Sequence, residues 1–392
     1  MTNISQLKRA TQRGAGIVET MIGILIGMIV ILVVYNVFAV SEGYKRAAVG
    51  AADAQSTGLY AQFVLSREIH NAGNGVLDSG IASAVSDLVQ CTNAQAAWRG
   101  FPSPPFPAAA VVPPRIRPTP VLIIDGGGPT ASDALIVTYS NAPHVVSPVQ
   151  FVDPPATGVA PFYVQSPNGF RANDRVIAIN PGTQTCELTT VTAVALGDSK
   201  GDATTGIVRL QHPAVLGNYT AGAPPDGSKL LNLGQQGEVA RTLYDIFNNQ
   251  LRSTDLLAAA PANPIAQNVV LLKAQYGIDC LGNGVISWTT ATASNICGDG
   301  VSYTRDAVLA WNGPTLARMR AIRIGIVVLS DEPDLKDPAL TGQSAVLFNC
   351  STNNAACQGR IVLDNTVLTD SYRFRTYETI VPMRNAIWNN GL

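Results

Sequence analysis

The stretch Arg13–Val40, RGAGIVETMIGILIGMIVILVVYNVFAV, decides how the rest of the chain is organised. From Ala15 to Val40 the run is apolar, and its only charged residue is Glu19. As a helix this run would rise about 39 Å, which is enough to cross a hydrocarbon core of about 30 Å with some tilt. A carboxylate at the centre of a bilayer costs roughly 2.5 to 3.5 kcal/mol, and less near the end of a span. We therefore expect a membrane-spanning helix in which Glu19 has a function.

The same stretch resembles the class III signal of type IV prepilins and type II secretion pseudopilins. The resemblance rests on Gly14, the small residue after it, Glu19 five positions after the glycine, and the uninterrupted apolar helix. It implies that a prepilin peptidase cuts between Gly14 and Ala15 and that Ala15 is then methylated. It also implies that Glu19 is an assembly carboxylate, which pairs with the amino terminus of a neighbouring subunit. Ala15 departs from the phenylalanine usual in the family, and this bears on methylation more than on cleavage.

Two other interpretations of the stretch compete with this one. Ordinary signal peptidase could cut near Ala39-Val40-Ser41, but the apolar run is about twice the length that such signals use. The helix could also be a plain single-pass anchor with an incidental Glu19, although charges inside membranes rarely lack a use.

Composition and charge indicate an exported protein. The chain has 392 residues, room for one large or two ordinary domains besides the helix. Only 14% of residues are charged and 46% are hydrophobic, which suits a strand-rich protein with uncharged loops. Lys8, Arg9 and Arg13 precede the apolar run without any acidic residue, so we expect the amino terminus in the cytoplasm and the chain after Val40 outside. No basic patch for nucleic acid stands out.

The six cysteines all follow the apolar run, in the part expected outside, where disulfides persist. Six cysteines allow 15 connectivities. Proximity favours Cys280 with Cys297 and Cys350 with Cys357, which leaves Cys91 for Cys186. A zinc site is disfavoured because no C-x-x-C occurs and the three histidines, His70, His144 and His212, are not spaced with the cysteines.

The helix is expected to continue well beyond the membrane, because no proline occurs before Pro102. Ala72-Gly73 is the predicted stop, which makes a helix of about 87 Å from Ala15. An apolar stripe at three- and four-residue steps is expected to pack on a globular domain; its members are Val49, Ala52, Ser56, Leu59, Phe63, Leu65 and Ile69. The predicted divisions are a leader over 1–14, a membrane and assembly helix over 15–40, its amphipathic continuation over 41–72, and a head domain over 73–392.

The head is predicted to be mainly antiparallel β-sheet, which makes the chain α+β. Residues 102–120 hold eight prolines and are expected to form an extended surface loop. Short β-branched or alternating runs predict strands over Val121–Ile124, Ala134–Tyr139, Arg175–Ile179, Leu188–Ala195 and Ile207–Leu210. Glu238–Phe247 and Gln250–Leu257 predict a hairpin across Asn248-Asn249. Ala321–Leu329 is expected to be a buried strand and Tyr372–Met383 a half-buried one.

Four segments resemble recurring blocks of the PilW family of minor pilins, in the family's order. They are SREIHNAG (Ser66–Gly73), AQNVVLLKAQYGID (Ala266–Asp279), MRAIRIGIVVLS (Met319–Ser330) and YRFRTYETIVPMRN (Tyr372–Asn385). With the leader they cover about a third of the chain. The resemblance implies a type IV pilin-like fold: a long amino-terminal helix packed on a large β head.

The chain carries no catalytic motif, so we expect no enzyme, no cofactor and no metal site. Two loops, Asp279–Gly284 and Asn295–Gly300, are rich in Asp, Asn and Gly like calcium loops. Neither has the alternating oxygen ligands of an EF-hand, and turns bounded by a disulfide are the favoured interpretation.

The expected function is that of a PilW-like minor pilin, which primes or caps filament assembly at the tip of a type IV pilus. Before assembly it would be a bitopic inner-membrane protein with a periplasmic head. The resemblance implies as partners the prepilin peptidase, the inner-membrane assembly platform, the major pilin, other minor pilins and a tip adhesin. The alternatives are a large tip pseudopilin of a type II secretion system, a role in which Glu19 would be unusual, and a membrane-tethered surface adhesin.

Overall fold

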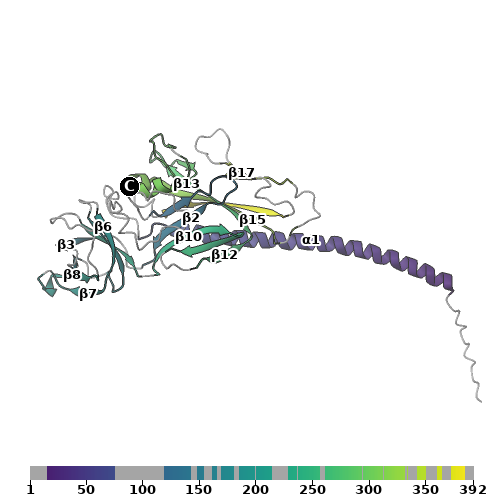
Figure 1. The fold of residues 1–392 in the computed structure, drawn as a ribbon, viewed down its shortest axis with the longest axis horizontal. Coiled ribbons are helices and arrows are strands. Elements are labelled where there is room, and N and C mark those ends of the chain that lie inside the picture. The colour runs from purple at the N-terminus through teal and green to yellow at the C-terminus, as the bar shows by residue number, and fades with distance from the viewer. Residues whose placement is uncertain are drawn as a thin grey trace, which may run out of the picture. The chain divides into compact units, whose positions relative to one another are not determined.

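The computed structural model describes residues 16–75, 119–142, 148–153, 161–165, 169–180, 185–198, 200–213, 228–235, 237–256, 261–293, 295–311, 313–331, 333, 342–349, 360–363 and 372–384. The chain divides into two compact units, Met1–Ala52 and Asp53–Leu392. This boundary falls inside the segment 41–72 that we expected to be the continuation of the helix. A long apolar helix and a large antiparallel β domain make the chain α+β (Figure 1).

The long helix is α1, Ile17–Asn71. At 1.5 Å per residue its 55 residues correspond to about 80 Å. Glu19 in the first turn and His70 in the last turn both suit the helix dipole. The helix ends beside the predicted stop, where Gly73 takes a φ of 80° and donates its N–H to the carbonyl of Thr138.

Two sheets of the second unit share one hydrophobic core with the end of α1. The five-stranded sheet has the order β1-β2-β10-β11-β12, and the four-stranded sheet has the order β14-β13-β15-β18. Their bounds are β1 Val121–Ile124, β2 Ala134–Ser140, β10 Val239–Phe247, β11 Gln250–Asp255, β12 Asn263–Gln267, β13 Val269–Asp279, β14 Ile286–Thr289, β15 Met319–Leu329 and β18 Phe374–Pro382. Two short helices, α3 Arg305–Ala310 and α4 Gly313–Ala317, precede β15.

A seven-stranded sheet lies between β2 and β10 in the sequence. Its order is β6-β5-β9-β3-β4-β8-β7, and every described pair in it is antiparallel. The bounds are β3 Val149–Asp153, β4 Phe162–Val164, β5 Arg175–Asn180, β6 Thr185–Thr190, β7 Ala193–Leu196, β8 Val208–Gln211 and β9 Lys229–Gly234, with a 3-10 helix, η1, at Ala203–Thr205. A small two-stranded sheet pairs β16 Ala345–Leu347 with β17 Ile361–Leu363.

The predicted hairpin is confirmed. β10 and β11 pair with Phe247 opposite Gln250, which leaves Asn248 and Asn249 as the two loop residues. Their φ angles of 51° and 57° are both positive, as a type I′ turn requires, and asparagine tolerates that region better than most residues. The buried strand expected over Ala321–Leu329 is also present as part of β15, whose residues are buried except for Arg320.

The single strand predicted over Leu188–Ala195 is wrong. β6 ends at Thr190 and β7 begins at Ala193, and the two strands lie at opposite ends of the seven-stranded sheet. Val191 between them is fully buried, and its backbone N–H and carbonyl bond to Asp174 and Asn173 rather than to a strand. The run TTVTAVA is uniformly β-prone, so its composition gave no sign of this break.

The two sheets that share a core are joined by two polar residues before β2. Ser132 and Asp133 lie along the part of β13 that β14 does not cover: the N–H of Asp133 donates to the carbonyl of Leu272 at 2.8 Å, and the Asp133 carboxylate accepts the N–H of Ala274 at 2.9 Å. Lys273 completes the site, with Nζ 2.7 Å from Asp133 Oδ1 and both side chains only 4% exposed. Burial raises the pKa of Asp133, and the charge of Lys273 opposes that rise.

Candidate functional site

The amino-terminal segment is the first candidate site. Gly14 and Ala15 lie outside the described residues, which begin at Gly16. Glu19 lies in the first turn of α1, where its N–H donates to the carbonyl of Gly16 at 2.9 Å. It is therefore at the end of the apolar run and not at its centre, a position where a carboxylate costs less in a membrane. Thr20 beside it donates its hydroxyl to the carbonyl of Ile17 and so keeps its own polar group satisfied.

The first unit presents apolar side chains along the helix. An 18-residue window of α1 reaches a mean hydropathy of 2.8, with none of its residues buried, so the helix is long and apolar enough to cross a membrane. A Cβ added at Gly16, Gly23, Gly27 or Gly43 would meet no atom within 4 Å. These glycines are thus open notches on the helix, and small residues of this kind let helices approach one another closely in lipid.

The face of α1 that packs on the head differs from the predicted stripe. Leu65 and Ile69 are fully buried as expected, but Val49, Leu59 and Phe63 are 51–61% exposed. The buried positions are Ala54, Gly58, Ala61, Val64, Leu65, Glu68 and Ile69. The reason is steric. Ala54, Gly58 and Ala61 on this face are small, so the helix lies close against the sheet, and its larger side chains point away from the sheet.

The closest approach is at Gly58. A Cβ built there would lie 2.0 Å from Cε2 of Tyr377 on β18, so the aromatic ring occupies the place that any other residue's side chain would take. The Tyr377 hydroxyl reaches past it to donate to the carbonyl of Ala54 at 3.2 Å. Gln62, one turn on, donates to the carbonyl of Glu378 at 3.3 Å. The carboxy-terminal strand and the helix are thereby held together along two turns.

A buried carboxylate holds the carboxy-terminal end of α1, and the sequence analysis did not predict this carboxylate. Glu68 is 5% exposed; it accepts the Tyr139 hydroxyl at 2.6 Å and Arg67 Nη2 at 2.7 Å. Burial, and then the negative charge of Glu68, raise the pKa values of Tyr139 and Tyr244. The sequence held one sign of this buried carboxylate: Glu68 is a charged residue next to Ile69 and three positions after Leu65, on a helix face that must be buried.

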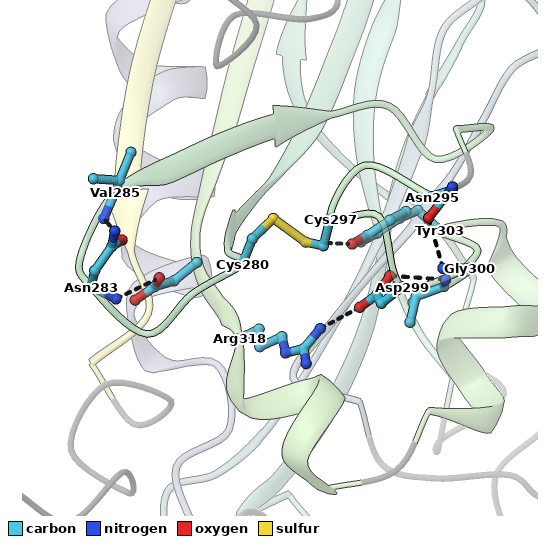
Figure 2. The surroundings of a disulfide bond; sticks show 11 residues. Cys280, Asn283, Val285, Asn295, Cys297, Asp299, Gly300, Tyr303 and Arg318 are labelled. Atoms are coloured by element: carbon cyan, nitrogen blue, oxygen red, sulfur yellow. Dashed lines mark hydrogen bonds and ion pairs between the residues drawn. A yellow bond between two sulfur atoms is a disulfide. The ribbon is translucent and has the colours of Figure 1, made fainter.

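The disulfide site is the second candidate. Cys280 and Cys297 form a disulfide with their Cα atoms 5.2 Å apart, which is the pair that proximity favoured. Figure 2 shows the bond between two loops, one with Asn283 and Val285 and the other with Asn295, Asp299 and Gly300. The Cys297 sulfur lies 3.4 Å from the hydroxyl of Tyr303. Burial raises the pKa of Tyr303 to about 12, and the charge of Asp299 adds to this.

The oxygens of these loops are engaged with the loops' own backbone. Asp279 accepts the N–H groups of Asn283 and Gly284, both at 3.1 Å. Figure 2 shows the corresponding bond of the second loop, in which Asn295 accepts the N–H of Gly300 at 2.7 Å. Such bonds define Asx-type turns.

Asp299 accepts the N–H of Val301 at 3.0 Å and pairs with Arg318. Burial acts to raise the pKa of Asp299, but these two partners outweigh it and the net shift is downward. Within the described part of the chain, no group of three or more His, Cys, Asp or Glu residues could hold a metal ion.

The remaining cysteines are placed only in part. The backbone of Cys186 lies in β6, opposite Ile179. Cys91, Cys350 and Cys357 lie outside the described residues, as does nearly all of the proline-rich segment 102–120. The predicted Cys350–Cys357 and Cys91–Cys186 pairs stay predictions.

No protein-family model, curated protein or solved structure matches this chain.

Proposed function

We propose that this protein is a minor pilin of the type IV pilus, of the PilW type, which primes or caps filament assembly. The observation that carries the proposal is the combination found in α1. The part of α1 that belongs to the first unit is apolar and exposed, with Glu19 in the first turn. The part from Ala54 to Ile69 packs closely on the β-rich head. A helix of this kind suits a protein that waits in a membrane and then enters a helical bundle.

The role of each part follows from the resemblance and from charge. A peptidase would cut after Gly14, and the leader with Lys8, Arg9 and Arg13 would stay on the cytoplasmic side, with the head in the periplasm. The cut frees an ammonium group at Ala15 that must enter the bundle together with Glu19. Two opposite charges are tolerated in an apolar environment mainly when they are paired, so Glu19 serves to bind the amino terminus of a neighbouring subunit.

A position at the filament end follows from size. The head follows a single helix that is about 11 Å across, yet it comprises most of the 392 residues. Subunits repeated along a filament would need their heads to stack as closely as their helices do. A head this large favours a place at the tip, in few copies, beside other minor pilins and above the major pilin.

The decisive experiment is mass spectrometry of the mature amino terminus. We expect a chain that starts at N-methylated Ala15, and we expect Gly14→Leu to abolish the cut. Gly43→Leu is the matched control, because a side chain at Gly43 meets open space and should leave processing unchanged. A mature chain that starts at Met1 or at Glu42 would exclude the pilin assignment and favour a tethered surface protein.

A second experiment tests the assembly carboxylate. Glu19→Ala should leave insertion and processing at Ala15 intact but reduce crosslinking to other pilins in the membrane. Within one helix Glu19 could instead pair with its own Ala15, four residues away. Crosslinking that is unchanged in Glu19→Ala would establish that local pairing and refute the intersubunit role.

A further inference from the structure

The seven-stranded sheet is an insertion at a single point of the second unit. β2 and β10 are neighbours in the five-stranded sheet, with Ser140 directly opposite Val239. Everything between these two residues in the sequence, including β3 to β9, leaves and returns at adjacent positions. Chain ends that lie this close together are typical of places where one domain is inserted into another.

The inserted sheet has its own hydrophobic core. Phe162, Val176, Val208, Leu210 and Leu230 are at most 1% exposed and belong to a cluster separate from the one that contains α1. The core around α1, in turn, includes no described residue between 141 and 238. Each described partner of β3 to β9 lies within the same sheet. Most of the apolar burial of this region is therefore independent of the helix-bearing sheets.

The joint between the two parts consists of polar contacts among the described residues. Ser140 donates its hydroxyl to the carbonyl of Leu233 at 2.7 Å and accepts the N–H of Ala142 at 3.1 Å. The bond from the N–H of Asn141 to the carbonyl of Glu238, at 2.8 Å, and the Arg171–Glu238 ion pair, at 3.4 Å, both lie within residues 141–238 and so do not join the two parts. On the helix-bearing side, Ser140 donates its N–H to the carbonyl of Asn74 just after α1, and the side-chain Nδ2 of Asn74 donates to the carbonyl of Ser140, both at 2.7 Å.

We infer that residues 141–238 form an inserted module that folds around its own core and is dispensable for the fold of the helix-bearing sheets. The second unit then consists of two parts with different roles. One part holds α1, and the inserted module can change its surface or bind a partner without disturbing how α1 is held. The inference concerns folding, so it does not depend on the pilin assignment.

The test compares two matched variants of the full-length protein in detergent by differential scanning calorimetry. Leu210 in the module and Leu135 in β2 are both completely buried, each in its own core. We expect two transitions in the wild type. Leu210→Ala should lower one midpoint by roughly 10 °C or more and leave the other in place, and Leu135→Ala should do the reverse. A single transition that both variants shift as a whole would overturn the inference.

A deletion variant gives an independent readout. Residues 141–238 are replaced by Asn-Gly, which suits a two-residue loop between paired antiparallel strands. We expect the variant to keep the Cys280–Cys297 disulfide and the protease resistance of the remaining head. Free thiols at both cysteines, together with rapid digestion by trypsin, would show that the helix-bearing sheets need the module and would refute the inference.

Discussion

Enlarging Gly58 should loosen the contact between α1 and the carboxy-terminal strand. Alanine is favoured over glycine in a helix by about 1 kcal/mol, so Gly58→Ala would stabilise an unobstructed helix. Here the new Cβ would lie 2.0 Å from Cε2 and 2.5 Å from both Cδ2 and Cζ of Tyr377, so the ring must move. Overpacking costs about 1 to 3 kcal/mol, and the lost bond from the Tyr377 hydroxyl to Ala54 costs about 1 kcal/mol more. The net result should be a destabilisation of about 1 to 3 kcal/mol.

The assay is denaturant unfolding of the purified protein, with the change repeated in a Tyr377→Ala background. Without the ring, the obstruction is gone, and Gly58→Ala should become neutral or stabilising by up to about 1 kcal/mol. Gly43→Ala is the control for a glycine with open space around it. If Gly58→Ala stabilises the wild-type protein as much as it stabilises the Tyr377→Ala variant, the packing argument is refuted.

Three further predictions concern the head. Glu68→Ala and Tyr139→Phe should each cost about 1 to 3 kcal/mol because both remove the same buried hydrogen bond, while Arg67, whose side chain is 58% exposed, stays solvated; an unchanged thermal midpoint in either variant would contradict this. Replacing Cys280 and Cys297 together by serine should lower stability by about 3 kcal/mol, since the bond closes a 17-residue separation, and an unchanged unfolding midpoint would show that the loops do not depend on it. Folding raises the pKa of Tyr303 to about 12, and it also raises that of Tyr139, from about 10 in the unfolded chain, so their contribution to stability is complete below pH 10 and falls above it. The difference in tyrosinate absorbance between the wild type and a variant with Tyr139→Phe and Tyr303→Phe should therefore rise together with unfolding; a rise before unfolding would contradict this.

Local patterns predicted the elements whose signals are local. The hairpin at Asn248-Asn249 follows from two residues that tolerate positive φ, and the burial of β15 follows from an unbroken apolar run. The break at Val191 could not be predicted, because it depends on bonds to Asn173 and Asp174 that form only once the module folds.

The error on the helix face has a general physical cause. Periodicity gives weight to large apolar residues such as Leu59 and Phe63, but a helix that lies very close to a sheet buries small ones, and Gly58 carries no hydrophobic signal at all. The charged Glu68 was missed for a different reason: its burial is stabilised by Tyr139, a partner 71 residues away in the sequence. The insertion between β2 and β10 also depends on pairing between distant segments, which no window of sequence contains.

The way in which Ser132 and Asp133 cover β13 bears on how the molecule avoids aggregation. An open strand edge is a template on which a second chain can add a strand, and this is a common route to aggregation. Along β13 the Ser132 hydroxyl accepts the N–H of Leu272, and the Asp133 carboxylate takes the N–H of Ala274, so these donors are not offered to another chain. Lys273 stabilises this arrangement because its charge pairs with the buried Asp133 carboxylate. Without Lys273, that carboxylate would be buried with no opposite charge beside it. Along this part of β13, side chains instead of another strand therefore protect the protein from forming the wrong intermolecular sheet.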